Sequence, residues 1–264
     1  MKKIVSLLLL TSLSLLAKDY YSKAAPYEIY IISSNVSGEV TYADEKRAGQ
    51  LLGSGRYLKI DDKLDQVELK SIESKVVLFE NTLKLNESML KNYEEMLQKK
   101  QTNYENIKSL KTKSTIEKDR EFYDLVTTQN QYIATQKEID NLKISINDLK
   151  LRIAQLKKSI SDKSFRAKGK VLYSLNVKEG QVVSPGMELA KIADVSKAKL
   201  TIYLNATDMK DARQKTLYIN GKKSKYKITR VWNIADATHL SSYKAEIIID
   251  RPEQFSQLIK VELK

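Results

Sequence analysis

The sequence has no cysteine and only one histidine, and these two shortages exclude several kinds of site. Without cysteine there is no disulfide framework, no thiolate-bound metal and no lipid-modified N-terminal cysteine on a mature chain. With His239 as the single histidine, no histidine-based metal cluster or triad is expected. We therefore expect neither an enzyme nor a bound cofactor.

Glycine and proline are also scarce, with 8 and 3 residues among 264, whereas 30% of the residues are charged. This composition is typical of long, solvent-exposed helices. The formal net charge of +13 admits a nucleic acid, an anionic membrane surface or an acidic protein as partner. Basic and acidic residues alternate through 84–163, and no run of five or six basic residues marks a nucleic-acid-binding arm. Nucleic acid is therefore not an expected partner.

The N-terminus has the pattern of a secretory signal peptide. Lys2 and Lys3 precede an apolar run over 4–16, which ends at Ala17 before a polar segment. About thirteen apolar residues are too few to cross roughly 30 Å of hydrocarbon as a helix. Because Leu15 occupies a position where a small residue is preferred, an uncleaved anchor remains the alternative to export and cleavage.

Two stretches in the middle of the chain show the 3-4 spacing of apolar residues that is typical of a coiled coil. The first starts at Leu69 and runs to Ile107, and nine of the eleven positions that follow Leu69 are apolar. The second runs from Ile139 to Ile160 and continues more weakly back to Leu125. Each stretch predicts a long helix whose apolar positions face a partner helix. The positions after Leu69 are Ile72, Val76, Phe79, Leu83, Asn86, Leu90, Tyr93, Leu97, Lys100, Tyr104 and Ile107, and those of the second stretch are Leu125, Thr128, Tyr132, Thr135, Ile139, Leu142, Ile146, Leu149, Ile153, Leu156 and Ile160.

A polar segment over 108–115 interrupts this spacing, and Ser114 with Glu117 resembles a capping box that starts a new helix. We therefore predict two antiparallel helices joined by a tight turn near 110–115. Each helix would have about 45 residues and a length of roughly 65 Å at 1.5 Å per residue. A long parallel dimeric coiled coil is the alternative, but it would not explain the interruption.

The segments on either side of the predicted hairpin repeat each other 131 positions apart. This distance lies far outside the period of solenoid repeats, so we interpret the pattern as one duplicated motif with a large insertion. Glycine and asparagine mark turns between short alternating strands, and Pro185-Gly186 fits the centre of a type II turn. We predict that the two copies pack face to face as one small β-sandwich. The turn glycines are Gly38, Gly49 and Gly55 in the first copy and Gly169, Gly180 and Gly186 in the second, and Leu58 recurs as Leu189.

The second copy resembles the second lipoyl-like half of the HlyD-type membrane fusion proteins, the periplasmic adaptors of tripartite efflux and secretion systems. The usual pattern of that family is a Gly-x-Val strand, then Glu-Gly-x-x-Val-x-x-Gly and Leu, ending in an acidic residue. The first copy is a looser match, and the resemblance covers roughly 30–264. The matching residues of the second copy are Gly169, Val171, Glu179, Gly180, Val183, Gly186, Leu189 and Asp194.

The resemblance implies an α+β fold: a long antiparallel coiled-coil hairpin inserted into a split lipoyl-like β-sandwich, followed by a β-barrel-like domain. True lipoyl domains carry a modified lysine where this chain has its hairpin, so a carrier of a swinging arm is not expected. The implied divisions are a signal peptide (1–17), an N-terminal segment with the first lipoyl-like half (18–62), the hairpin (63–163), the second half (164–195) and the β-barrel-like domain (196–264).

The hairpin tip also resembles that of the family. Adaptors that engage TolC-type channels commonly show Arg-x3-Leu-x6-Ser, followed by an Asp five residues on. The same spacing here is Asn103, Ile107, Ser114 and Asp119. Asn103 lacks the bidentate donor of an arginine, and three nearby lysines could offer other cationic contacts. The alternative is that Ser114 is only an N-cap and Ile107 only a residue of the helix interface. The three lysines are Lys108, Lys111 and Lys113.

The resemblance thus implies a periplasmic adaptor, held at the inner membrane by its partner, that acts through assembly and not catalysis. Its expected partners are an inner-membrane transporter of RND or ABC type, a TolC-type outer-membrane channel and further copies of itself. A secreted coiled-coil scaffold of the cell envelope without a transporter is the alternative. That alternative explains the heptads and the export signal, but not the matched β-halves.

Overall fold

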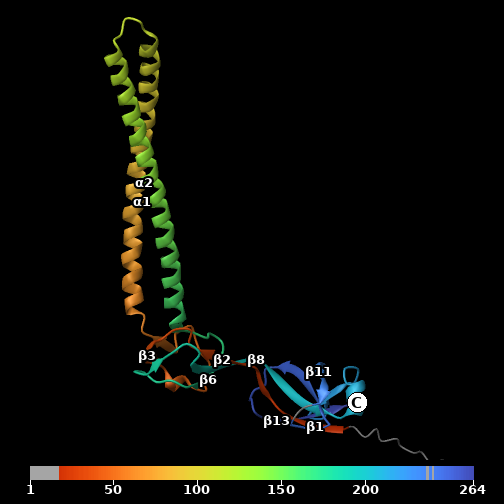
Figure 1. The fold of residues 1–264 in the computed structure, drawn as a ribbon. Helices are drawn as coiled ribbons and strands as arrows, with labels where there is room; N and C mark the ends of the chain where they lie inside the picture. The colour runs from red at the N-terminus through yellow and green to blue at the C-terminus, as the bar shows by residue number, and fades with distance from the viewer. Residues whose placement is uncertain (1–17, 236–237, 240) are drawn as a thin grey trace, which may run out of the picture. The chain divides into compact units, whose positions relative to one another are not determined.

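The computed structural model describes residues 18–235, 238–239 and 241–264, and the predicted signal peptide over 1–17 lies outside them. The chain is α+β, with one long helical hairpin and several β-sheets (Figure 1). It divides into two compact units, of which one is 60–164 and the other combines the preceding residues with 165–264. No helix in the described part of the chain is both long enough and apolar enough to cross a membrane.

Two long helices form the first unit, and short strands form most of the second. In chain order the elements are β1 (Lys18–Lys23), β2 (Ala25–Ser33), β3 (Gly38–Ala43), the 3-10 helix η1 (Glu45–Arg47), β4 (Leu58–Ile60), α1 (Lys63–Ser109), α2 (Thr115–Asp162), β5 (Ser164–Phe165), β6 (Val171–Leu175), β7 (Val182–Val183), β8 (Glu188–Leu204), α3 (Ala206–Lys210), β9 (Leu217–Ile219), β10 (Lys222–Lys223), β11 (Ile228–Ala235), β12 (Tyr243–Asp250) and β13 (Leu258–Leu263).

The helices α1 and α2 have 47 and 48 residues, which confirms the helical hairpin predicted from the apolar spacing. Every buried residue of either helix belongs to the predicted spacing, because these side chains are the ones that the partner helix covers. On α1 only Val76 is fully buried, whereas α2 buries seven residues. The seven are Leu125, Thr128, Thr135, Ile139, Leu142, Ile146 and Leu156.

A row of ion pairs also joins the two helices, with acidic side chains on α1 and basic side chains on α2. The row repeats every seven residues on both helices, the period at which positions return to the same edge of a two-helix interface. All six side chains are about half exposed, so each pair stabilises the hairpin by well under about 1 kcal/mol. They mark the register of the two helices, because each pair joins residues that lie opposite each other. The pairs are Glu73–Lys157 at 2.9 Å, Glu80–Lys150 at 2.9 Å and Glu87–Lys143 at 3.7 Å.

The two copies of the repeated motif exchange backbone hydrogen bonds. The N–H of Gly180 donates to the carbonyl of Val40 at 2.8 Å, and the N–H of Gly49 donates to the carbonyl of Leu172 at 2.7 Å. Gly49 and Gly180 are equivalent in the repeat, and their φ angles of 81° and 83° lie in the region that favours glycine. Each copy thus supplies the partner strand that the other lacks, and together they form one β-domain.

The apolar positions of the repeat form the core of this domain. Leu58 and its counterpart Leu189 are fully buried, and Leu52 and its counterpart Val183 are 2% and 1% exposed. Since burial of a leucine or valine side chain stabilises by about 1.5–3 kcal/mol, these positions supply much of the stability that neither copy could reach alone.

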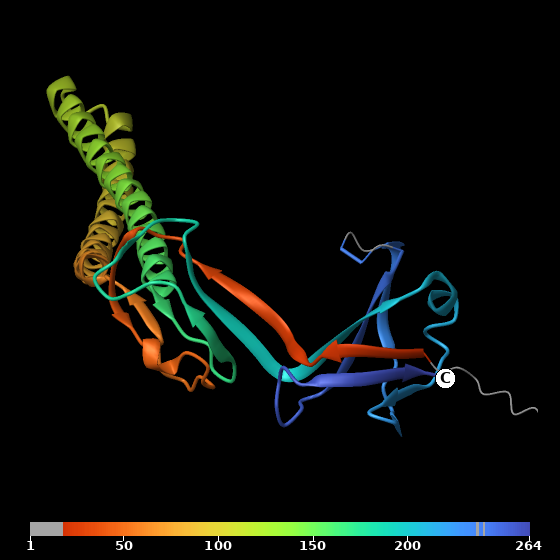
Figure 2. The ribbon, with the colours of Figure 1, turned by 90° about the horizontal axis from the view of Figure 1, so that it is seen from below.

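The C-terminal strands form two sheets together with β1, β2 and β6, and a further apolar core lies among these strands. One has the order β1-β13-β9-β10, and the other the order β11-β12-β8-β2, with β6 also pairing with β8. The strand β8 runs without a break across the predicted domain boundary at 195–196, and Figure 2 shows it beside β2. The strand β1 lies in the C-terminal sheet, where it pairs with β13 from Lys18–Leu263 to Lys23–Leu258. The buried residues between the sheets include Leu200, Ile202, Leu204, Leu217, Ala245, Ile247 and Val261.

Candidate functional site: the hairpin tip

The tip is the short turn between the two long helices. The helix α1 ends at Ser109, where the N–H of Leu110 donates to the carbonyl of Ile107 at 3.0 Å. Four further residues follow before α2 starts at Thr115. The turn is therefore as tight as the sequence predicts, and it leaves the last carbonyls of α1 and the first N–H groups of α2 close to solvent.

The start of α2 is a capping box, as the sequence predicts. The hydroxyl of Ser114 accepts from the N–H of Glu117 at 3.3 Å, and the N–H of Ser114 donates to the Glu117 carboxylate at 3.0 Å. Lys113 also donates to that carboxylate at 3.0 Å. The ammonium of Lys113, followed by the N–H and hydroxyl of Ser114, holds the pKa of Glu117 below its usual value. The capping role of Ser114 is therefore established by geometry.

The other predicted tip residues are spread over both helices. Asn103 and Lys108 are exposed on α1, where Ile107 is half-buried, and Asp119 is exposed on the first turns of α2. Lys108 lies over the ring of Tyr104 with its ammonium 5.7 Å from the ring centre. The structure thus groups Lys113 and Ser114 with Glu117. Within residues 18–235, the side chains of Asn103, Lys111 and Asp119 form no hydrogen bond or ion pair.

An aromatic cluster below the turn was not predicted. The rings of Tyr104 and Phe122 lie 5.6 Å apart and join α1 to α2, and the ring of Tyr123 lies 5.9 Å from that of Phe122. The alternating spacing of α2, extended by one step before Leu125, leads to Glu121 and not to Phe122, so the spacing does not indicate this contact. Lys100, a polar residue of the α1 spacing, donates to the carbonyl of Asp124 at 3.3 Å. These contacts hold the two helices together next to the turn.

The tip also exposes apolar side chains. Ile116 is 80% exposed, Tyr123 is 67% exposed and Leu110 is 45% exposed. These three apolar side chains lie on the turn and on the first turns of α2.

The predicted turn glycines lie in the β-domain and are distant in sequence from the hairpin turn. Gly186 has a φ of 86°, and the N–H of Met187 donates to the carbonyl of Ser184 at 3.1 Å, as expected for the predicted type II turn. Gly49, Gly169 and Gly180 also have positive φ, whereas Gly38 begins β3 and Gly55 has an ordinary backbone conformation. Their role is conformational.

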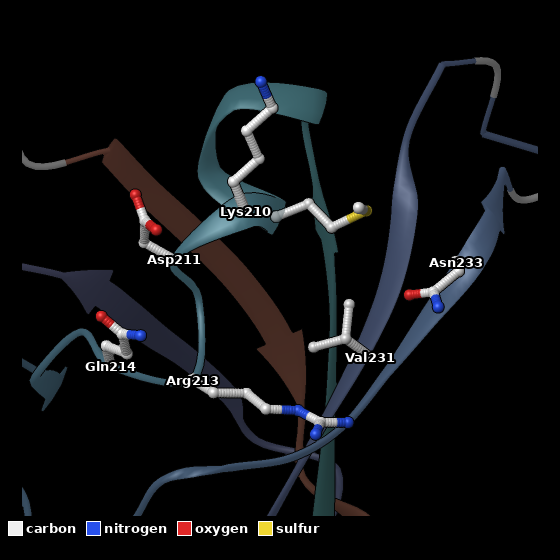
Figure 3. A pocket seen from close by; sticks show the side chains of 7 residues that line it. Lys210, Asp211, Arg213, Gln214, Val231 and Asn233 are labelled. Atoms are coloured by element: carbon white, nitrogen blue, oxygen red, sulfur yellow. The ribbon is translucent and has the colours of Figure 1, made fainter.

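A separate pocket of about 350 Å³ lies between the segment over 209–214 and β11 (Figure 3). Arg213 extends toward β11, while Lys210 and Asp211 point away from it. The lining offers hydrogen-bond donors but no pair of nucleophile and base. Among the residues that the structure describes, no three His, Cys, Asp or Glu side chains are grouped so that they could hold a metal ion. The lining residues are Met209, Lys210, Asp211, Arg213, Gln214, Val231 and Asn233.

No family model matches the sequence, and a sequence search of curated proteins finds no match. Solved structures do match. MacA from Actinobacillus actinomycetemcomitans is 18% identical with a TM-score of 0.64, over 94% of this chain and 78% of that chain. Spr0693 from Streptococcus pneumoniae R6, a membrane fusion protein, is 8% identical with a TM-score of 0.57, over 94% and 98%. A MacA–MexA chimera with the Pseudomonas aeruginosa MexA α-hairpin domain is 16% identical with a TM-score of 0.55, over 94% and 80%. At these identities the likeness establishes a shared fold.

Proposed function

The chain has the fold of the membrane fusion proteins, and from this premise we propose that it is a periplasmic adaptor. It would link an inner-membrane transporter of RND or ABC type to a TolC-type outer-membrane channel, for efflux or secretion. It would act by holding these partners together, without catalysis. Export to the periplasm would use the signal peptide over 1–17, and the transporter would keep the protein at the inner membrane.

The observation that carries this proposal is the insertion of the hairpin between the two halves of one β-domain. Helices of 47 and 48 residues extend from a domain whose halves supply strands to each other. The seven-residue ion-pair row and the buried spacing of α2 support an antiparallel coiled coil. The reciprocal pairing of the repeat supports a split lipoyl-like sandwich. A helical hairpin of this length, inserted in a small β-domain, suits a protein that bridges two partners.

We assign channel docking to the exposed end of the hairpin. Ile116 and Leu110 would supply apolar contact, and Lys108 and Lys111 would supply the cationic contacts for which Asn103 is too short and uncharged. Ser114 would act indirectly, because its hydroxyl is already used by the capping box.

Two exposed apolar stripes support assembly of several copies. On α1, Leu85 and Met89 are 68% and 45% exposed, and Met89 is two residues (about 200°) beyond Glu87 of the ion-pair row. On α2, Ile144 is 61% exposed and lies two residues (about 200°) from both Leu142 and Ile146, which are buried, so it faces away from α1. The first stripe therefore lies away from the ion-pair row and the second on the outer face of α2, and we assign to them the packing of α1 of one copy against α2 of the next. The first stripe is Leu64, Leu78, Leu85, Met89 and Met96, and the second is Ile116, Tyr123, Ile144 and Leu151.

The proposal is tested in cells by a photoreactive residue at Lys111, which lies in the turn and takes no part in the capping box. A matched probe at Lys84, exposed midway along α1, controls for contacts of the hairpin shaft. We expect the Lys111 probe to capture an outer-membrane channel, identified by mass spectrometry, and the Lys84 probe to capture mainly further copies of the chain. Capture of only copies or cell-wall components at Lys111, with normal expression, would support the envelope scaffold in place of the adaptor.

A further inference from the structure

The positive charge of the chain is concentrated in one region. The hairpin unit over 60–164 contains 19 basic and 18 acidic residues, so it is almost neutral. The C-terminal segment over 196–264 contains 14 basic and 7 acidic residues. More than half of the net charge of +13 therefore belongs to the C-terminal β-domain, which is where an anionic partner would be attracted.

Within this domain, many of the basic side chains lie in one segment of nine residues. Residues 222–230 contain five cations and no acidic residue, and we call these five side chains the basic segment. They occupy β10, the following turn and the start of β11, and all five are exposed. Lys225 is paired with Asp250 at 2.6 Å, whereas no other member has a carboxylate within ion-pair distance in the part of the chain that the structure describes. The basic segment is Lys222, Lys223, Lys225, Lys227 and Arg230.

The strand that continues from the basic segment carries aromatic and apolar side chains. Trp232 is half-buried between two cations, with Lys244 4.6 Å and Arg230 5.4 Å from its ring. Ile234, two residues further along β11, is 81% exposed. Cations beside a tryptophan and an exposed aliphatic side chain are the composition of surfaces that rest on the headgroup region of a membrane.

We propose that the basic segment and β11 bind an anionic phospholipid surface, with Trp232 and Ile234 at the level of the headgroups. A nucleic acid or an acidic protein would use the same cations, whereas a lipid surface also takes up the exposed isoleucine and the amphipathic ring at the level of the headgroups. The lipid contact goes beyond the adaptor role, and it does not depend on docking of the hairpin tip to a channel.

The test uses the purified full chain and lipid vesicles. Vesicles of phosphatidylcholine with a minority of phosphatidylglycerol should co-sediment the protein, and pure phosphatidylcholine vesicles should not. Binding should weaken as the salt concentration rises, because the attraction is screened. Trp232 is the single tryptophan of the chain, so its fluorescence emission should shift to shorter wavelength on the anionic vesicles.

A triple variant identifies the surface. K222Q/K223Q/K227Q removes three unpaired charges and leaves the contacts of Trp232 unchanged. Since each cation near an anionic surface contributes a factor of about five to partitioning, we expect binding to fall by at least about tenfold. The variant K84Q/K91Q/K99Q removes the same number of exposed charges from α1 and should bind like the unchanged protein.

Three results would overturn the proposal: no binding to anionic vesicles, an equal loss in both variants, or binding without any change in Trp232 emission. Equal binding to a DNA duplex or to polyglutamate at the same ionic strength would also overturn it, because the surface would then be a general polyanion site. The vesicle experiment contains no channel, so failure of the tip crosslinking would leave its result standing.

Discussion

Asp65 joins the two ends of the hairpin, and its replacement by asparagine tests how the long helices are held at their base. Its carboxylate accepts from the hydroxyl of Ser159 at 2.7 Å and from the ammonium of Lys163 at 3.0 Å. Asp65 lies in the first turn of α1, and Lys163 caps the end of α2. The side chains of Asp65 and Lys163 are only 20% and 12% exposed, so solvent screens this pair less than the ion pairs along the shaft.

We expect D65N to lower the free energy of unfolding by about 1–2 kcal/mol at neutral pH, because a hydrogen bond to a charged group is lost and Lys163 keeps an unpaired charge. For a chain of this size the melting temperature should fall by about 3–6 °C. Burial raises the pKa of the Asp65 carboxyl, but the hydrogen bonds from Ser159 and Lys163 lower the pKa by more. The resulting pKa lies below the usual value. A lowered carboxyl pKa stabilises the fold above the unfolded pKa of about 4, and this contribution disappears as the pH falls through the folded pKa.

Thermal unfolding followed by far-ultraviolet circular dichroism measures this effect, because most of the helical signal comes from the hairpin. The difference between D65N and the unchanged protein should be constant at neutral pH and should shrink below pH of about 4. D148N, at an exposed carboxylate without a partner among residues 18–235, is the control and should shift the melting temperature by less than about 1–2 °C. Equal stability of D65N and the unchanged protein at neutral pH, or a difference that persists in acid, would refute the reasoning.

Three further predictions concern the hairpin and the β-domain. G180A should destabilise by about 1–2 kcal/mol in chemical denaturation, because its φ is +83°. The added methyl meets no atom within 4 Å, so the cost comes from the backbone conformation. G55A, at an ordinary backbone conformation, is the control and should be nearly neutral; equal effects of the two variants would contradict this. S114A should cost about 1 kcal/mol and speed amide exchange at Glu117 and its neighbours, and protection as strong as before would show that the cap is dispensable. E80K should destabilise by less than about 1 kcal/mol, and E80K/K150E should recover it. A double-mutant cycle without coupling would contradict the ion pair between Glu80 and Lys150.

The hairpin could be predicted because its signals are local. The apolar spacing around Ile139 and Leu142 repeats within a few residues, and both side chains are buried in the structure. Ser114 and Glu117 are three residues apart, and the capping box that they form needs no distant partner. Gly49 and Gly180 could be identified from the repeat, and their shared positive φ explains why both copies require glycine.

The features that were missed depend on pairing between distant residues. Alternation within Lys18–Lys23 indicates a strand, but it does not indicate that the partner is Leu258–Leu263 at the other end of the chain. The charges of α1 and α2 look like solvated faces until the register places Glu80 opposite Lys150. The strand β8 continues through 195–196, and the sequence does not indicate this continuity because it depends on pairing with β2 and β12.

The ladder between β2 and β8 has a mechanical consequence. The strands are paired antiparallel from Ala25–Lys199 to Ser33–Glu188, so a pull along the strand axis shears all rungs together. Peeling the strands apart from one end would break the rungs one after another, at a much smaller force. A tensile load that enters along β8 is therefore shared by many hydrogen bonds of this ladder.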